Sequence, residues 1–171
     1  MVSIVEASEK DYQAIRSTAN QAWSQAFGRV STEAQTGYML EMMYGITSLT
    51  KKQRNDGQKI CLAAEGNAYL GYLTYETNYN GSSKTKIHKI FILPIEQGKG
   101  IERLLINKIS KIATDHNNNS LILNTDSGDP SLHIYEELGF RKTGRENVLI
   151  GTSLLMEDYI MEMPLLARQY A

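Results

Sequence analysis

The chain has 171 residues, of which 18 are lysine or arginine, 19 are aspartate or glutamate, and 42% are hydrophobic. This length predicts a single domain over residues 1–171, with a core large enough to fold without disulfides or a structural metal. A formal net charge of −1 excludes a general attraction to nucleic acid, and a single cysteine excludes an intrachain disulfide framework. The three histidines lack the spacing of a helical zinc site, so we expect no metal.

The sequence predicts neither a membrane segment nor a targeting segment. No apolar run approaches the roughly 20 residues that cross a bilayer. The first residues turn acidic before the core of a signal peptide can form. We therefore expect a cytoplasmic protein with no membrane partner and no nucleic-acid partner.

The first third of the chain predicts one strand followed by helices. Residues 2–7 alternate well enough for a strand, and Ser8 with Asp11 resembles a capping box that opens a helix through about Trp23. A second helix is predicted over about 32–44. The mixed stretch 47–58 predicts a further polar helix or a loop.

The middle of the chain predicts strands and one long helix. Residues 59–64 and 68–76 predict a β-hairpin, and a polar loop then leads to a strand over about 86–93 that ends at Pro94. A glycine-rich turn precedes a helix over about 100–115. Its expected buried face has i, i+3 and i+4 spacing and consists of Ile101, Leu104, Leu105, Ile109, Ile112 and Ala113.

The last third predicts a short helix between strands. Residues 121–123 suit a central strand, and Asp129–Pro130 suits the start of a helix that ends at Gly139. Two more strands are predicted near 140–142 and 158–163. The order β-α-α-β-β-β-α-β-α-β-β is that of an α+β fold, with one mixed sheet and helices packed on its faces.

The most informative stretch is the glycine-rich turn between Pro94 and the helix. Such a turn directs several unpaired backbone N–H groups at one point, where the positive end of the helix dipole reinforces them. Gly98 and Gly100 leave room for a phosphate. The turn therefore predicts a phosphate or pyrophosphate site, or else a plain turn that uses glycine for geometry alone. It lacks the spacing of a Walker A loop and the third glycine of a dinucleotide fingerprint.

This turn also carries a resemblance to a known family. The residues Gln97–Ile101, after an apolar strand that ends in Pro94, resemble the acetyl-CoA signature of the GNAT acetyltransferase superfamily, Gln/Arg-x-x-Gly-x-Gly/Ala. The segment Ile134–Phe140 resembles the family's second signature, and the strand Asp158–Met163 is similar to that of bacterial diamine (spermidine/spermine-type) acetyltransferases. The resemblance implies one GNAT-like domain with a central mixed, mostly antiparallel sheet that is splayed at the cofactor site, and helices on both faces.

The resemblance implies acetyl-CoA as the co-substrate. Main-chain groups of Ile92 and Leu93 would contact the pantetheine arm, and the turn would hold the pyrophosphate. Where the family often carries a cofactor-contacting asparagine, this chain has Gly128, so that contact is either missing or replaced by Asp126 or Ser131. The implied cofactor-binding residues are Ile92, Leu93, Gln97, Gly98, Lys99, Gly100, Ile101, Glu102, Ser131 and Tyr135.

The resemblance also implies catalytic residues. Attack of an amine on a thioester expels a thiolate, and Tyr135 matches the family's tyrosine that protonates it, as an acid with a pKa of about 10 can do; the alternative is a tyrosine that only packs beneath the sheet. The amine must lose a proton, and Glu76 and His88 are the candidate bases, each with a structural role as its alternative. Cys61 lies in a predicted core strand and is not needed as a nucleophile.

Acceptor specificity in the family comes largely from the first two helices. Aromatic and methionine side chains of this region would line a slot for the apolar stem of an amine, with ordinary helix packing as the alternative. Glu33 and Glu41 supply acidic groups, although glutamates on helices are mostly solvated. The side chains concerned are Trp23, Phe27, Tyr38, Met42 and Tyr44.

One departure from the signature bears on activity. Glu102 stands where the family has glycine or alanine, and a carboxylate near a pyrophosphate is repulsive. Either its side chain turns outward, since a glutamate in the first turn of a helix is favourable, or the affinity for the cofactor is lower than usual.

The resemblance thus implies an N-acetyltransferase that moves acetyl from acetyl-CoA to a primary amine by direct attack in a ternary complex. The favoured acceptor is a small di- or polyamine, and the alternative acceptors are an amino acid, an antibiotic amine and a protein N-terminus. The alternative is a catalytically weak acyl-CoA-binding or sensing protein with the same fold, which Glu102 favours. A nucleic-acid-binding module is disfavoured by the balanced charge. Dimers are frequent in the superfamily, so a homodimer is left open.

Overall fold

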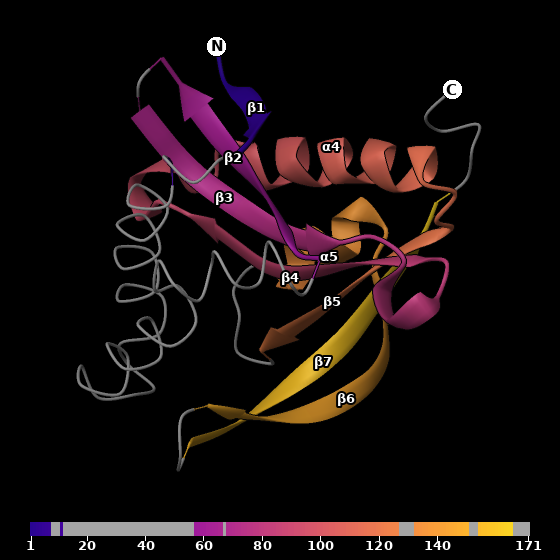
Figure 1. Ribbon diagram of the computed structural model, residues 1–171. Helices are drawn as coiled ribbons and strands as arrows, with labels where there is room; N and C mark the ends of the chain where they lie inside the picture. Colours follow the sequence, from indigo (N-terminus) through magenta and orange to yellow (C-terminus); the bar gives the residue numbers. More distant parts are fainter. Residues whose placement is uncertain (8–10, 12–56, 67, 127–131, 151–153, 166–171) are drawn as a thin grey trace. The chain divides into compact units, whose positions relative to one another are not determined.

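The computed structural model describes residues 1–7, 11, 57–66, 68–126, 132–150 and 154–165 (Figure 1). The predicted helices between residues 8 and 56, with the aromatic, methionine and acidic side chains named above, lie outside the described residues, as does Ser131. The described elements are β1 (Ser3–Glu6), β2 (Lys59–Glu65), β3 (Ala68–Glu76), η2 (Tyr79–Gly81), β4 (Lys84–Ile92), η3 (Pro94–Glu96), α4 (Ile101–Asp115), β5 (Ser120–Asp126), α5 (Leu132–Leu138), β6 (Arg141–Ile150) and β7 (Leu154–Pro164).

The strands form one mixed sheet in the order β1-β2-β3-β4-β5-β7-β6. β4 pairs with β5 in parallel, whereas β1 with β2, β5 with β7 and β6 with β7 are antiparallel. This confirms the predicted mixed, mostly antiparallel sheet. The parallel ladder joins residues 84–87 to residues 120–123, and β4 continues beyond it to Ile92. That the two strands part beyond this ladder stays a prediction.

The chain forms two compact units. The first comprises residues 1–74 and 89–106, and the second comprises residues 75–88 and 107–171. The first contains β1, β2, most of β3 and the glycine-rich turn, and the second contains β5, α5 and the paired strands β6 and β7 (Figure 1). Each unit is described below by itself.

The predicted hairpin strands β2 and β3 form because both are apolar runs that the fold buries. Residues 60–63 of β2 and residues 70–75 of β3 are buried on both strand faces, as expected for strands inside a sheet. Gly66 between them has a φ of +62°, a conformation that favours glycine and suits a short hairpin turn.

The long helix α4 confirms its predicted bounds but not all of its predicted buried face. Ile101, Leu105, Ile109 and Ala113 are buried, whereas Leu104 is 42% exposed. Leu104 lies about 100° around the helix from Leu105, away from the buried rows. The apolar spacing in the sequence did not show which of these residues would face the core. In the structure the residues spaced by four, from Ile101 to Ala113, face it, and Leu104 does not. The second buried row contains Glu102, Ile106 and Ser110.

The last two strands are longer than predicted. β6 and β7 pair from Arg141–Glu162 to Ile150–Leu154, with a bulge between Lys142 and Gly144. Residues 141–146 are all exposed, so hydrophobic alternation gave no signal there. Backbone pairing with β7 holds this edge strand in place. The short helix α5 ends as predicted at Gly139, whose φ is +116°.

No helix in the described ranges is long and apolar enough to cross a membrane.

Candidate active site

The glycine-rich turn has the backbone geometry that its sequence predicts. Gly98 and Gly100 have φ values of +82° and +80°, and a Cβ at either position would meet no atom within 4 Å. α4 starts directly after the turn, and its Leu104 N–H donates to the carbonyl of Gly100 at 3.2 Å. Open space beside the two glycines, together with the positive end of the helix dipole, fits an anionic group such as a pyrophosphate.

Hydrogen bonds attach the glycine-rich turn to the end of β4 and to Leu93, which follows it. The amide of Glu96 donates to the carbonyl of Leu93 at 2.8 Å, and the side-chain nitrogen of Gln97 lies 3.5 Å from the carbonyl of Ile92. The amide of Leu93 donates to the carbonyl of Leu70 on β3 at 2.9 Å. The predicted pantetheine contacts at Ile92 and Leu93 are therefore already engaged within the protein, although each carbonyl keeps a second lone pair.

Lys99 carries the positive charge of the turn, and it has an anionic partner within the turn. Its ammonium lies 3.0 Å from a carboxylate oxygen of Glu96, and the two side chains are 57% and 20% exposed. An exposed pair of this kind contributes little to stability. Lys99 can thus exchange Glu96 for a phosphate at small cost.

Of the two alternatives for Glu102, the structure contradicts the outward-turned side chain. Glu102 is only 7% exposed, whereas the next two residues of the helix are exposed. The reason is its position in the same i, i+4 row as Ile106 and Ser110, both of which are buried. Glu102 is therefore packed inward in the first turn of α4.

Replacing Glu102 with glutamine is expected to tighten acetyl-CoA binding about fivefold, because a fixed negative charge near a pyrophosphate is removed at constant side-chain volume. The melting temperature should fall slightly, because a first-turn glutamate stabilises a helix by roughly 0.3–1 kcal/mol. Isothermal titration calorimetry measures the affinity. Glu137→Gln, at an exposed position of α5, is the matched control. An unchanged affinity in Glu102→Gln would show that the carboxylate does not act on the ligand.

The two candidate bases form a pair in the second unit. His88 Nε2 lies 3.2 Å from Glu76 Oε1, and the two side chains are 20% and 23% exposed. The ring of Tyr79 meets the His88 ring edge-on, with centroids 5.7 Å apart and planes at 77°. Glu76 ends β3 and His88 lies on the next strand, so the sequence named both residues but not their contact. A carboxylate that holds a histidine ring in place is an arrangement suited to proton removal.

Tyr79 is itself fixed by an asparagine clamp, which the sequence did not predict. The amide of Asn78 donates to Asn118 Oδ1 at 2.9 Å, and Asn118 Nδ2 donates to Asn78 Oδ1 at 2.8 Å. The Thr85 hydroxyl donates to the same Asn118 oxygen at 2.6 Å. This ties the loop that carries Tyr79 to both α4's C-terminal end and β4.

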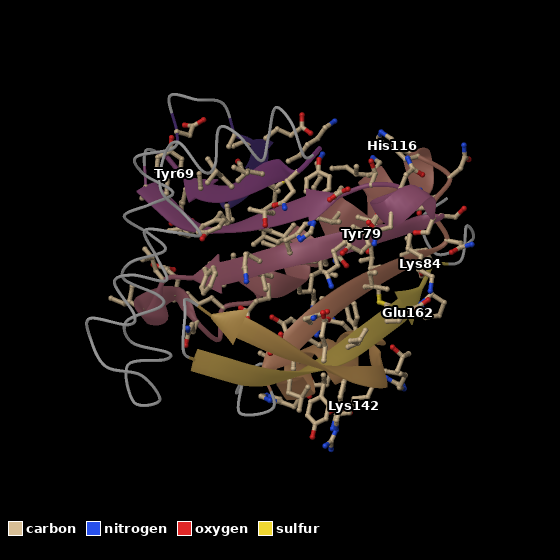
Figure 2. The ribbon with its side chains drawn as sticks, turned by 60° about the horizontal axis from the view of Figure 1, so that its bottom comes forward. Tyr69, Tyr79, Lys84, His116, Lys142 and Glu162 are labelled. Carbon is tan, nitrogen blue, oxygen red and sulfur yellow. The ribbon has the colours of Figure 1, made fainter. Side chains whose placement is uncertain are left out.

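Lys86 is a further polar group that sequence reasoning missed. Its ammonium donates to Asn124 Oδ1 at 2.6 Å and lies 5.7 Å from the centre of the Tyr79 ring. Burial lowers the pKa of Lys86, while the carboxylates of Glu146 and Asp158 act in the opposite direction. The neighbouring Lys84 pairs with Glu162 at 3.0 Å (Figure 2). The sequence did contain a signal for this group, because residues 84, 86 and 88 alternate along β4 and therefore lie on the same face of the strand.

Stability is expected to depend on pH through Lys86. The folded protein releases this proton at a lower pH than the unfolded chain, so the unfolded state holds more protons below the ordinary lysine pKa of 10.5. The free energy of unfolding of the wild type, relative to that of Lys86→Met, should therefore rise as the pH increases toward that value. Urea unfolding of both proteins across this range measures the difference. A difference that is independent of pH would contradict the expectation.

Tyr135 lies in the second unit, on α5, and is only 3% exposed. Its ring meets Phe140 edge-on, with centroids 6.1 Å apart and planes at 67°, and its carbonyl accepts a hydrogen bond from the Phe140 amide at 3.0 Å. These contacts fix the ring. They fit both predicted alternatives, a packed tyrosine and a positioned acid.

The predicted site residues fall into both units. Those of the range 92–102 lie in the first unit, and the Glu76–His88 pair lies in the second. Among the described residues, no three histidine, cysteine, aspartate or glutamate side chains form a group that could hold a metal.

Comparison with known protein families decides the class of this chain. The sequence pattern of the acetyltransferase (GNAT) domain matches residues 10–156. The chain belongs to the GNAT acetyltransferase family. This confirms the predicted acetyltransferase family and the α+β fold of GNAT type.

Individual GNAT relatives are distant. The chain is 26% identical over 92 residues to the L-amino acid N-acyltransferase MnaT of Escherichia coli, and the match covers 52% of this chain and 54% of that protein. The chain thus spans about half the length of this curated relative.

Solved GNAT structures share the fold. The PaiA N-acetyltransferase of Thermoplasma acidophilum, in complex with coenzyme A, has a TM-score of 0.81 at 16% identity over 96% of this chain and 99% of that chain. A chimera of the spermidine N-acetyltransferase SpeG from Vibrio cholerae and hSSAT has a TM-score of 0.72 at 19% identity over 99% and 97%. At these identities the likeness shows the fold alone.

Proposed function

We propose that this protein transfers the acetyl group of acetyl-CoA to a primary amine by direct attack in a ternary complex. The observation that carries the proposal is the turn at Gly98 and Gly100, whose open backbone precedes the N-terminus of α4. Acetyl-CoA supplies the thioester, whose C–S bond breaks as the C–N bond of the amide forms.

The chain's own residues move the protons. The amides at the start of α4 and in the turn bind the pyrophosphate, and Lys99 adds a positive charge there. His88, held by Glu76 at 3.2 Å, takes the proton that the amine loses. Tyr135, whose ring Phe140 holds, returns a proton to the departing thiolate. No covalent acyl-enzyme is part of this route.

The acceptor that the charges favour is a small di- or polyamine. Four carboxylates act on the side chains of one face of β4: Glu76 contacts His88, Glu162 contacts Lys84, and Glu146 and Asp158 act on Lys86. Lys84 and Lys86 offset two of these four negative charges, and the remaining excess of negative charge attracts an acceptor with more than one ammonium group. A spermidine N-acetyltransferase among the proteins of similar fold supports the same class. The L-amino acid acyltransferase among the relatives makes amino acids the competing class.

A second candidate function is a catalytically weak acyl-CoA-binding or sensing protein. The observation that favours it is the buried carboxylate of Glu102 at the start of α4. A single domain, a cytoplasmic location and a homodimer stay predictions.

The test is thiol release from acetyl-CoA by the purified protein across a panel of amines. Spermidine, spermine and putrescine represent the favoured class, and amino acids represent the competing one. Turnover with the polyamines alone supports the proposal in full, and turnover with amino acids alone replaces the acceptor class. Binding of acetyl-CoA by calorimetry without turnover across the panel would favour the acyl-CoA-binding function. Absence of both would contradict the proposal.

A further inference from the structure

β3 and β4 approach each other unusually closely at Gly71. A Cβ built on Gly71 would lie 2.5 Å from the carbonyl oxygen of Phe91, 2.8 Å from Cδ1 of Ile92 and 3.1 Å from Cα of Ile92. Cβ atoms do not occur at the first two distances, and the nearest of these atoms belongs to the backbone. A backbone atom cannot rotate away as the end of a side chain can, so a side chain at position 71 would have to displace β4.

The requirement for glycine at this position is one of space. Gly71 is not among the described glycines with a positive φ, so an L-amino acid could adopt its backbone conformation. Gly98 and Gly100 are the opposite case, because they have a positive φ and open space around them. Gly71 had no role that could be predicted from the sequence, since nothing local distinguishes it from any other glycine in a strand.

The segment that Gly71 contacts carries the turn. Leu93, the next residue after Ile92, is bonded to Leu70 through its amide at 2.9 Å, and its carbonyl accepts the amide of Glu96 at 2.8 Å. The carbonyl of Ile92 faces the side-chain nitrogen of Gln97 at 3.5 Å. A shift of Phe91 and Ile92 would therefore move the attachment points of the glycine-rich turn.

We propose that Gly71 is a positioning residue of the acetyl-CoA site. Because it has no side chain, the end of β4 can lie close to β3, and this placement of β4 determines the position of the glycine-rich turn. The inference rests on the proposed function, since it assumes that this turn binds acetyl-CoA. Gly71 itself touches no ligand. It acts through Ile92 and Leu93, at which the turn is attached.

The experiment compares Gly71→Ala with Gly144→Ala. Both place one methyl group on a strand glycine without a positive φ, but the new Cβ at Gly144 would meet its nearest atom, Ile160 Cδ1, at an ordinary 3.6 Å. Calorimetry measures the dissociation constant of acetyl-CoA, and circular dichroism with thermal melting confirms folding. We expect at least about tenfold weaker binding in Gly71→Ala, because displacement of a preorganised site is costly, and a change below about twofold in Gly144→Ala. A merely structural role would lower the melting temperature without changing the affinity of the folded protein.

A second pair of variants tests the attachment without changing the core. Glu96→Pro removes the amide that donates to Leu93, whereas Glu96→Ala keeps that amide and removes the same carboxylate. We expect weaker acetyl-CoA binding in Glu96→Pro than in Glu96→Ala. This pair decides the outcome if Gly71→Ala does not fold.

The outcomes separate this inference from the proposed function. A wild-type protein that does not bind acetyl-CoA would overturn both. Binding by the wild type with equal affinity in folded Gly71→Ala would overturn the role of Gly71 alone. If Gly71→Ala does not fold, equal affinity in Glu96→Pro and Glu96→Ala would overturn it instead.

Discussion

Replacing Tyr135 with phenylalanine is expected to lower the turnover of acetyl transfer at least about 100-fold while acetyl-CoA still binds, because a positioned general acid typically contributes this much or more. The change removes one oxygen atom and keeps the ring. The edge-on packing against Phe140, at 6.1 Å between centroids, should therefore persist. Steady-state thiol release gives the turnover, and calorimetry gives the affinity for acetyl-CoA.

The control for this prediction is Tyr159→Phe. Tyr159 lies on β7 in the same unit, where its ring is flanked by the cations of Lys142 and Arg145 at 4.3 and 5.1 Å from the ring centre. Loss of its hydroxyl should leave turnover unchanged. If Tyr135→Phe turns over at the wild-type rate, Tyr135 is a packing residue and the thiolate is protonated by another group or by water.

Replacing His88 with alanine is expected to lower turnover by about 100-fold, because the amine then loses its nearby proton acceptor. Glu76→Gln should lower turnover by about tenfold, because the amide still orients the ring but no longer supports a positive charge on it. The pH–rate profile of His88→Ala should differ from that of the wild type, because the imidazole no longer takes part in proton transfer.

Two further variants make the pair testable as a unit. The effects of substitutions at residues that act together are not additive. Glu76→Gln should therefore lower turnover no further in the His88→Ala background. His116→Ala is the matched control. His116 is exposed and directly follows α4, and among the contacts described its ring bonds only to the carbonyl of Ile112, 2.9 Å away. Full activity and an unchanged pH profile in His88→Ala would mean that the Glu76–His88 pair supports structure and that the base lies elsewhere.

Local signals in the sequence determined the parts of this protein that depend on residues close together in the chain. The turn at Gly98 and Gly100 was predictable because a positive φ favours glycine wherever it occurs. The bounds of α4 followed from the same turn and from a periodic apolar face. The second GNAT signature, Ile134–Phe140, indicated the family. Together these local features predicted the fold class and the place of the cofactor turn.

Tertiary structure alone decided the features that depend on which chain segments meet. Glu102 is buried because of the row of α4 that packs inward, and its own sequence neighbourhood favoured an exposed first-turn carboxylate. Glu76 and His88 were separate candidates until neighbouring strands placed them 3.2 Å apart. Gly71 acquired its role only from the backbone of β4, 2.5 Å from where its Cβ would be. Each of these features depends on which other segment packs against the residue, and periodicity within one segment carries no information about the atoms that face it.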